Sequence, residues 1–147
     1  MNQFEKDLEL GRIYEAEWLK HVEYDTYEQA PSDRAFTDWD IKTIKDNENT
    51  TFEIKVDRIS YKYGNLAIEF ERTSGKKSGI NVTRADFWIH FALDGKGGYT
   101  VFKFPRRELK QMIRDGLYLS VKETWDGSRF VLMEMKNLKR YVYKVVY

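Results

Sequence analysis

The chain has 147 residues and a formal net charge of +1, and its 41% hydrophobic and 16% aromatic content argues against long disorder and predicts one folded domain over residues 1–147. It contains no cysteine, which excludes disulfides, thiolate metal sites and cysteine nucleophiles and makes a cytoplasmic location the simplest expectation. No stretch approaches the roughly 18 apolar residues of a membrane span, and the N-terminal residues are largely charged, so we expect neither membrane insertion nor secretion.

The first predicted element is a helix over residues 2–23. Side chains at three- and four-residue spacing define one stripe along it, comprising Phe4, Leu8, Gly11, Trp18 and Val22. At about 100° per residue, Glu15 lies near the centre of this stripe. An inward carboxylate costs free energy unless it is paired, hydrogen-bonded or bound to a cation. Glu15 is therefore a candidate for a metal ligand, for a buried pair with an arginine, or for a residue that reaches the edge of the stripe because the helix bends.

A polar connector over residues 24–35 leads into a predicted β-hairpin. Its strands are the runs 36–44 and 50–59, and residues 45–49 join them. Side chains alternate between the faces of an extended strand. In the second strand the apolar face is expected to pack on the core. The other face carries charged residues, and it either lies in solvent or forms part of a functional site.

The charged faces of the two hairpin strands contain the candidate site residues. The second strand presents Glu53, Lys55 and Asp57 on one face, and the first presents Asp38, Asp40 and Lys42.

The rest of the chain predicts more sheet and one late helix. Strands are expected over residues 66–71, 84–93, 99–104, 128–135 and 140–147, and a helix that begins at Pro105 is expected to end before Gly116. A Gly- and Lys-rich loop covers residues 72–83. His90 lies within an apolar strand, so we expect a core residue rather than a catalyst. Tyr141, Tyr143 and Tyr147 alternate along the last strand, so we expect them to line one of its faces. That face suits a contact between the subunits of a homodimer.

The acidic residues and the lysine suggest a metal-dependent hydrolytic site. Glu15, Asp40 and Glu53 could converge with Lys55 at one end of the sheet. Carboxylate oxygens suit Mg²⁺, which usually keeps several waters and takes one or two carboxylates together with a substrate phosphate. A neighbouring lysine could orient or deprotonate the attacking water, helped by a pKa that burial would lower.

The order of Asp40, Glu53 and Lys55 resembles the D…(D/E)-x-K signature of the PD-(D/E)xK nuclease superfamily. The segment "GRIYEAE" is similar to the Gly-x-x-x-Glu start of Holliday-junction resolvases, in which a first-helix glutamate joins the metal site, a role that falls here on Glu15. The phrase "GNLAIEFE…SGI…TRADFW" is similar to small phage-encoded endonuclease-like proteins. Together these motifs cover roughly residues 8 to 72 and extend by that phrase to Trp88.

The resemblance implies an α/β, restriction-endonuclease-like fold, in which helices flank a mixed β-sheet. It implies a Mg²⁺-dependent endonuclease acting on DNA, with Mn²⁺ as a substitute, with Glu15, Asp40 and Glu53 as metal ligands and Lys55 as a catalytic residue. Homodimers are common among such proteins. The sequence departs from the pattern because no proline precedes Asp40, which leaves Asp38 as a rival. Glu69 and Glu71 are further acidic residues that could supplement the site or lie at a solvated sheet edge.

Positive charge for phosphate contacts is available in two regions, the loop after residue 71 and the late helix. The candidate DNA-binding residues are Arg72, Lys76, Lys77, Arg84, Arg106 and Arg107. A solvated loop and a solvated helical face explain the same charges. No base-reading motif is evident, so recognition of branched or otherwise structured DNA fits better than sequence readout.

Three interpretations follow from these patterns. The first is a metal-dependent DNA endonuclease. The second is a catalytically silent nucleic-acid-binding or protein-interaction module that has kept a nuclease-like fold. The third is an unrelated α/β protein, in which Lys55 pairs with Glu53 or Asp57 on an exposed face and Glu15 does not approach Asp40.

Overall fold

The computed structural model describes residues 2–31 and 35–147 of the chain. Within them the helices and strands are, in chain order, α1 (Gln3–His21), β1 (Thr26–Gln29), β2 (Ile41–Lys45), β3 (Glu48–Asp57), α2 (Ser60–Tyr63), β4 (Asn65–Arg72), β5 (Phe87–Leu93), β6 (Tyr99–Pro105), α3 (Arg106–Arg114), β7 (Ser120–Glu123), β8 (Ser128–Glu134) and β9 (Val142–Val146). Short 3₁₀ turns occupy Gly79–Asn81, Met135–Asn137 and Lys139–Tyr141.

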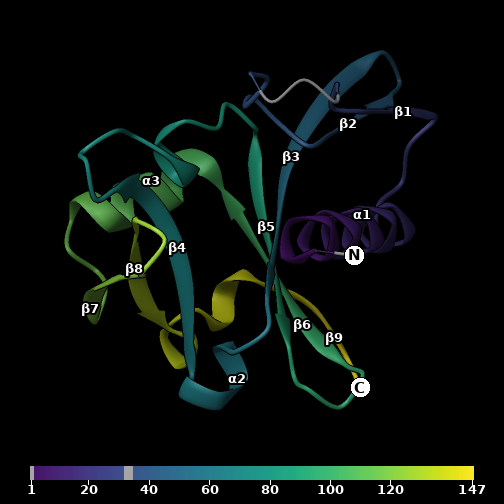
Figure 1. Cartoon of the computed structure of the whole chain (residues 1–147). Coiled ribbons are helices and arrows are strands. Elements are labelled where there is room, and N and C mark those ends of the chain that lie inside the picture. The colour runs from purple at the N-terminus through teal and green to yellow at the C-terminus, as the bar shows by residue number, and fades with distance from the viewer. Residues whose placement is uncertain (1, 32–34) are drawn as a thin grey trace.

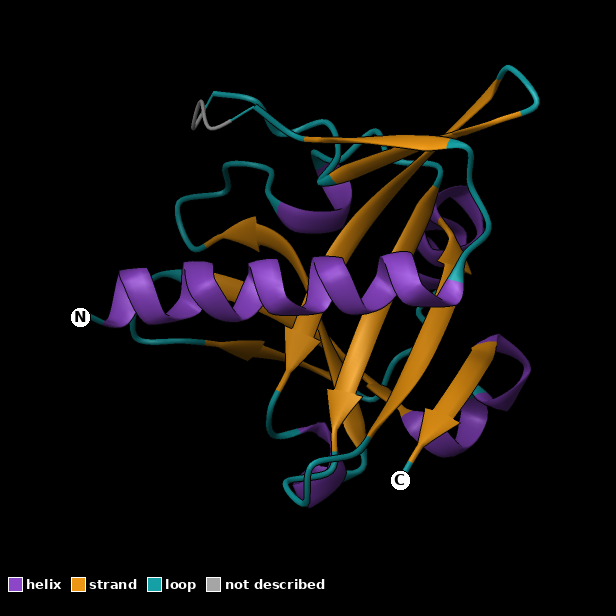
Figure 2. Cartoon of the chain, turned by 90° about the vertical axis from the view of Figure 1, so that its right-hand side faces the viewer, coloured by secondary structure: helices purple, strands orange, loops and turns teal. Residues whose placement is uncertain are grey.

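The strands form two sheets that pack against each other (Figures 1 and 2). A six-stranded sheet has the order β1-β2-β3-β5-β6-β9, and a three-stranded sheet has the order β4-β8-β7. Strand β3 pairs in parallel with β5, whereas the other neighbouring strands of the six-stranded sheet are antiparallel. The expected α/β class and mixed sheet are therefore confirmed.

Two apolar clusters bury the two faces of the larger sheet. One lies under α1, where Trp18 is fully buried against Ile41, Phe52 and Phe91. The other lies between the two sheets and under α3, and its members include Leu66, Trp88, Phe104, Leu109 and Val131. We expected helices to flank the sheet, but the second face is covered mainly by β4 and β8 together with α3 (Figure 1).

Helix α1 matches the predicted helix closely. Its N-terminus is capped by Asn2, whose Oδ1 accepts a hydrogen bond from the Glu5 backbone N–H at 2.8 Å. Trp18 packs on the sheet as expected, but Phe4 and Leu8 of the same stripe are 58% and 50% exposed. The reason is that the N-terminal part of α1 extends beyond the strands of the large sheet (Figure 2).

The predicted hairpin is present with a tighter turn and a shorter first strand. Asp46 and Asn47 both have positive φ angles, 51° and 64°, as a two-residue hairpin turn requires. Strand β2 begins at Ile41, so Asp38 and Asp40 lie just before it and do not share a strand face with Lys42. The ladder nevertheless starts at Asp40, whose backbone N–H donates to the Phe52 carbonyl at 2.9 Å.

The third predicted strand, β4, leaves the hairpin's sheet and pairs with β8. The chain then returns through residues 73–86 to β5, which lies beside β3. This return places the Gly- and Lys-rich loop near the residues that precede β2. The turn at Gly79 has a φ of +54°, and a Cβ there would come within 2.1 Å of the Glu69 carbonyl oxygen, so only glycine lets the loop pack this closely on β4.

The C-terminal strand differs from the expected alternation of tyrosines. Tyr141 lies before β9 and is buried against Phe104, with ring centroids 4.8 Å apart. Tyr143 and Tyr147 are exposed, so two of the three tyrosines remain at this surface. Within residues 2–31 and 35–147, no helix combines the length and the apolar character needed to cross a membrane.

Candidate active site

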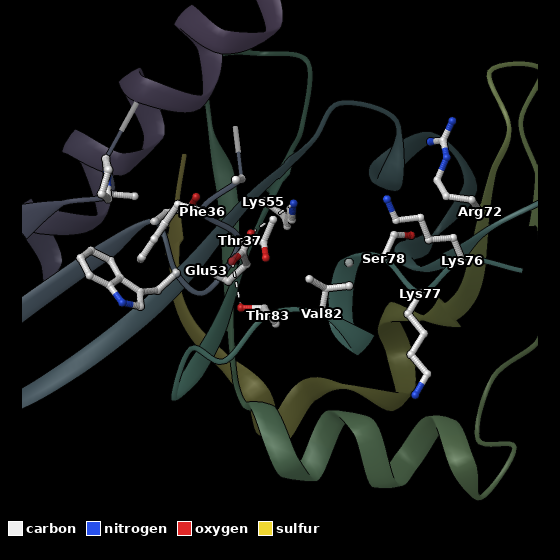
Figure 3. Close-up of a pocket in the computed structure, with 16 residues that line it drawn as sticks. Phe36, Thr37, Glu53, Lys55, Arg72, Lys76, Lys77, Ser78, Val82 and Thr83 are labelled. Atoms are coloured by element: carbon white, nitrogen blue, oxygen red, sulfur yellow. Dashed lines mark hydrogen bonds and ion pairs between the residues drawn. The ribbon is translucent and has the colours of Figure 1, made fainter. Parts of the chain in front are cut away.

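A cavity of about 740 Å³ opens where the residues before β2, strand β3 and the loop between β4 and β5 meet (Figure 3). Acidic, basic and aromatic side chains line different parts of it. Among its lining residues are Phe36, Trp39, Asp40, Glu53, Lys55, Arg72, Lys76, Lys77 and Thr83. The structure therefore brings Asp40, Glu53 and Lys55 together, as the sequence predicts.

Asp40 is held in place by the strand beside it. Its Oδ2 accepts a hydrogen bond from the Ile54 backbone N–H at 2.7 Å. Burial and the neighbouring Glu53 carboxylate raise the pKa of Asp40 to about 7, against the opposing effect of Lys55. The ordinary pKa of an aspartate is near 3.8, so Asp40 ionises at a much higher pH than usual, near neutrality. A cation close to Asp40 would stabilise its ionised form.

Glu53 projects from β3 between a hydroxyl and an ammonium. Its Oε1 accepts a hydrogen bond from Thr83 Oγ1 at 2.9 Å, and its Oε2 lies 3.3 Å from Lys55 Nζ. The Glu53 side chain is only 13% exposed. Thr83, on the loop before β5, thus fixes the carboxylate. The sequence does not predict this contact, because a hydroxyl in a loop gives no indication of its partner.

Lys55 lies beside the two carboxylates with its side chain 41% exposed. Burial lowers its pKa, but the negative charges of Glu53 and Asp40 raise it by more, so the net shift is upward. The expected fall in the pKa of Lys55 is therefore not found. Lys55 is a cation at neutral pH, and it suits orientation of a water or a phosphate better than proton abstraction.

Glu15 approaches this site without entering the cavity. It is half-buried on α1, and burial together with the Glu53 charge raises its pKa, while Arg12 opposes the shift. The Glu15 charge contributes in turn to the raised pKa of Asp40. In the described part of the chain, no three Asp, Glu, His or Cys side chains stand close enough together to hold a metal ion. The structure thus unites Asp40 and Glu53 but leaves Glu15 at the periphery.

The predicted DNA-binding residues of the loop divide into two kinds. Lys76 and Lys77 are exposed and line the cavity across from Glu53 and Lys55 (Figure 3). Arg72 also lines the cavity, but its guanidinium donates to Ser128 Oγ and to the Asp126 carbonyl, each at 2.5 Å. Arg72 is therefore occupied in joining the loop to the β7–β8 turn.

The other predicted DNA-binding arginines lie outside the cavity. Arg84 is 81% exposed, with its Nε 4.0 Å from Asp38 Oδ1, and Arg106 Nε donates to the Ala85 carbonyl at 2.7 Å. Arg107 is exposed on α3.

Positive charge nevertheless continues from the cavity to α3. Burial and the nearby charges of Arg114, Arg106 and Lys77 lower the pKa of Lys110. In Figure 3, Lys77 points from the cavity rim toward the helix α3. The basic loop and α3 are thus electrostatic neighbours.

The remaining polar candidates have structural partners. Asp38 faces Arg84, which favours Asp40 as the acidic residue of the site. Glu71 lies 3.4 Å from Arg129, whereas Glu69 is close enough for its charge to raise the pKa of Lys55.

His90 is a core residue, as expected. It is 2% exposed, its Nε2 lies 3.0 Å from Asp57 Oδ2, and its Nδ1 accepts a hydrogen bond from Trp88 Nε1 at 3.2 Å. Because Nδ1 accepts, Nε2 carries the proton that binds Asp57. Both ring nitrogens are satisfied inside the protein.

Comparisons of this chain with protein-family models, with curated proteins and with solved structures find no match.

Proposed function

We propose that this chain is a metal-dependent endonuclease that hydrolyses DNA phosphodiester bonds. The observation that carries the proposal is the convergence of Asp40, Glu53 and Lys55 on one cavity whose opposite wall is basic. Two partly buried carboxylates beside a lysine provide both a cation site and a fixed positive charge. On this proposal the mixed sheet with α1 on one face is the core of a restriction-endonuclease-like fold of the PD-(D/E)xK superfamily.

The donor set fits Mg²⁺ or Mn²⁺. Asp40 and Glu53 supply hard oxygen ligands, and Mg²⁺ needs only one or two protein carboxylates because water and a substrate phosphate complete its coordination. The Glu53 charge raises the pKa of Asp40, so a cation near both would remove an existing repulsion. When bound, such an ion lowers the pKa of a coordinated water and stabilises charge that develops on the phosphate.

The protein's own residues prepare the site for this chemistry. Thr83 holds the Glu53 carboxylate, and the Ile54 backbone N–H holds the Asp40 carboxylate, so both groups are oriented before any ligand binds. The Lys55 ammonium lies where it can bind a non-bridging phosphate oxygen or orient the attacking water. Its charge stabilises an anionic transition state without a proton transfer.

The basic residues around the cavity supply contacts to the DNA backbone. Lys76 and Lys77 lie across from the carboxylates, and Arg106 and Arg107 extend the positive surface along α3. Contacts of this kind position a strand without reading its bases. We therefore propose branched or otherwise structured DNA as the substrate, and a homodimer formed through the exposed surface of β9 as the state that acts on it.

A second candidate is a catalytically silent nucleic-acid-binding module with the same fold. Its support is that Glu53 already pairs with Lys55 and that Glu15 does not complete a set of three carboxylates in the described residues. This candidate predicts DNA binding that is independent of divalent cations.

Cleavage of labelled linear duplex, single-stranded and four-way-junction DNA, with and without Mg²⁺ or Mn²⁺, separates the two candidates. The endonuclease yields products only with the metal. Retention of DNA without products under every condition would support the silent module.

A further inference from the structure

The candidate site has an aromatic wall that phosphodiester hydrolysis alone does not require. Phe36 and Trp39 both line the cavity, and their ring centroids lie 5.1 Å apart at an interplanar angle of 85°. Lys42 Nζ lies 5.2 Å from the centre of the Trp39 ring, so its ammonium packs over one face of the indole and holds the ring in place. Trp39 is only partly exposed, and it directly precedes Asp40 in the chain.

The aromatic and basic walls face each other across the catalytic side chains. In Figure 3, Phe36 lies on one side of Glu53 and Lys55, and Lys76 and Lys77 lie on the other. An aromatic ring binds the face of a nucleobase, and ammonium groups bind phosphate oxygens. The cavity thus offers one surface for a base and another for the strand's backbone.

The size of the cavity favours DNA with an unpaired base over continuous duplex DNA. A volume of about 740 Å³ suits a ligand about as large as one nucleotide. In a duplex each base is covered by its stacked neighbours, so a base reaches an aromatic side chain in a cavity only when it is unpaired or extruded. Because the positive charge continues from Lys77 to Lys110 and Arg114 on α3, the surface suits a polymer rather than a free nucleotide.

We propose that the cavity binds one unpaired nucleotide of a DNA strand, with its base stacked on Trp39 and its backbone directed toward Lys76 and Lys77. This inference rests on the proposed function and narrows its substrate class to DNA that is single-stranded or locally unpaired at the cleavage point. Branch points, flaps and single strands meet this condition, and a continuous duplex does not.

Tryptophan fluorescence reports this stacking without any cleavage. The chain has four tryptophans, of which Trp18 and Trp88 are 0% and 1% exposed and Trp125 is 99% exposed. In a Trp125→Phe background, Trp39 is therefore the tryptophan that a ligand can reach. Oligothymidylate added in EDTA should quench this fluorescence, whereas a strand of the same length built from abasic sites should not.

Affinity provides a second readout with a matched control. Trp39→Leu should weaken binding of oligothymidylate by about tenfold or more, as loss of a base–aromatic stack does. Trp39→Phe should retain most of the binding, and Trp125→Leu should leave it unchanged because Trp125 does not line the cavity. Thermal unfolding of Trp39→Leu and Trp39→Phe shows whether each variant is folded.

The outcomes separate this inference from the proposed function. Base-dependent quenching together with weaker binding by Trp39→Leu supports the inference even if no metal yields cleavage, in which case the nuclease assignment alone fails. Equal quenching by the abasic strand, or equal losses in the Trp39 and Trp125 variants, overturns the inference. Metal-dependent cleavage of duplex DNA that is unchanged by Trp39→Leu also overturns it and leaves the nuclease assignment intact.

Discussion

Lys55 Nζ lies 3.3 Å from Glu53 Oε2, and the two side chains leave the same face of β3. The pair is not an ordinary surface ion pair, because Glu53 is only 13% exposed and its other oxygen is bound by Thr83. With Asp40 lining the same cavity, Lys55 is the cation of a cluster that contains two carboxylates. Features of the third interpretation are also present, because Lys55 pairs with Glu53, its side chain is 41% exposed, and Glu15 does not line the cavity. That interpretation therefore stays a competing prediction.

Replacing Lys55 should abolish most of the catalysis without removing the metal site. Lys55→Met deletes the positive charge nearest the carboxylates, and loss of one such electrostatic group typically lowers kcat by about 10²- to 10³-fold. The measurement is single-turnover DNA cleavage at saturating Mg²⁺. Lys62→Met, at an exposed position of helix α2 outside the cavity, is the control and should cleave like wild type. An unimpaired Lys55→Met would exclude a catalytic role for this lysine.

Asp40 should impose a pH dependence on metal binding. Its pKa is about 7, so the carboxylate is largely protonated at pH 5 to 6 and largely ionised above pH 8. Because a metal ligand must lose its proton, Mn²⁺ affinity measured by calorimetry should rise with pH through about 7. Asp40→Asn should bind Mn²⁺ weakly and without this rise. The same rise in Asp40→Asn would assign the titration to another group.

The same raised pKa predicts the direction of a change in stability. In the folded protein Asp40 holds its proton up to a pH near 7, whereas in the unfolded chain it loses it near 3.8. The folded state therefore binds more protons between these values, and Asp40 makes the free energy of unfolding fall as pH rises through this window. Asp40→Asn should be more stable than wild type at pH 8 and closer to it at pH 4 in urea denaturation. A variant that is less stable at pH 8 would contradict the raised pKa.

Most of the elements could be predicted because their side chains alternate or recur. Helix α1 and strands β3 and β8 each place an apolar row on a buried face, whereas β5 and β6 are apolar along most of their length and are buried on both faces. The sequence does not predict strands β1 and β7, because all of their residues are exposed and their side chains form no hydrophobic pattern. The sequence also does not predict that the strands divide into two sheets. The alternation of side chains in β4 is the same whether this strand pairs with the hairpin or with β8.

The site was predictable only where its residues lie on one strand or in one motif. Glu53 and Lys55 share a face of β3 by the alternation of side chains, and the motif supplied Asp40. Thr83 comes from a loop thirty residues later, placed by the parallel pairing of β3 with β5. The sequence assigns Trp39 no role, because the cavity that it lines forms from three separate segments.

Thr83 should act through Glu53 rather than on the substrate. Thr83→Val keeps the shape of the side chain but removes the hydroxyl that donates to Glu53 Oε1. Loss of a hydrogen bond that orients a metal ligand typically lowers metal affinity by about 10- to 100-fold. Mn²⁺ titration should show this loss, and excess Mn²⁺ should restore cleavage. A defect that excess metal does not correct would contradict a role for Thr83 through the metal ligand.

His90 should contribute to stability and not to cleavage. His90→Ala leaves the buried carboxylate of Asp57 and the Trp88 Nε1–H without this partner, which should lower the free energy of unfolding by about 1 to 3 kcal/mol. Urea denaturation measures this change. Cleavage per folded molecule, assayed below the onset of unfolding, should match wild type. A stable His90→Ala protein with impaired cleavage would instead give His90 a role at the site.

The central claim is tested most directly by comparing two glutamate-to-glutamine variants for metal-dependent DNA cleavage. Glu53→Gln removes a carboxylate from the cavity, whereas Glu71→Gln removes one that pairs with Arg129 on the second sheet. With Mg²⁺ or Mn²⁺ and a substrate that contains unpaired nucleotides, wild type and Glu71→Gln should cleave, and Glu53→Gln should not. Equal cleavage by the two variants, or no cleavage by wild type on any DNA with either metal, would contradict the assignment of this cavity as a nuclease site.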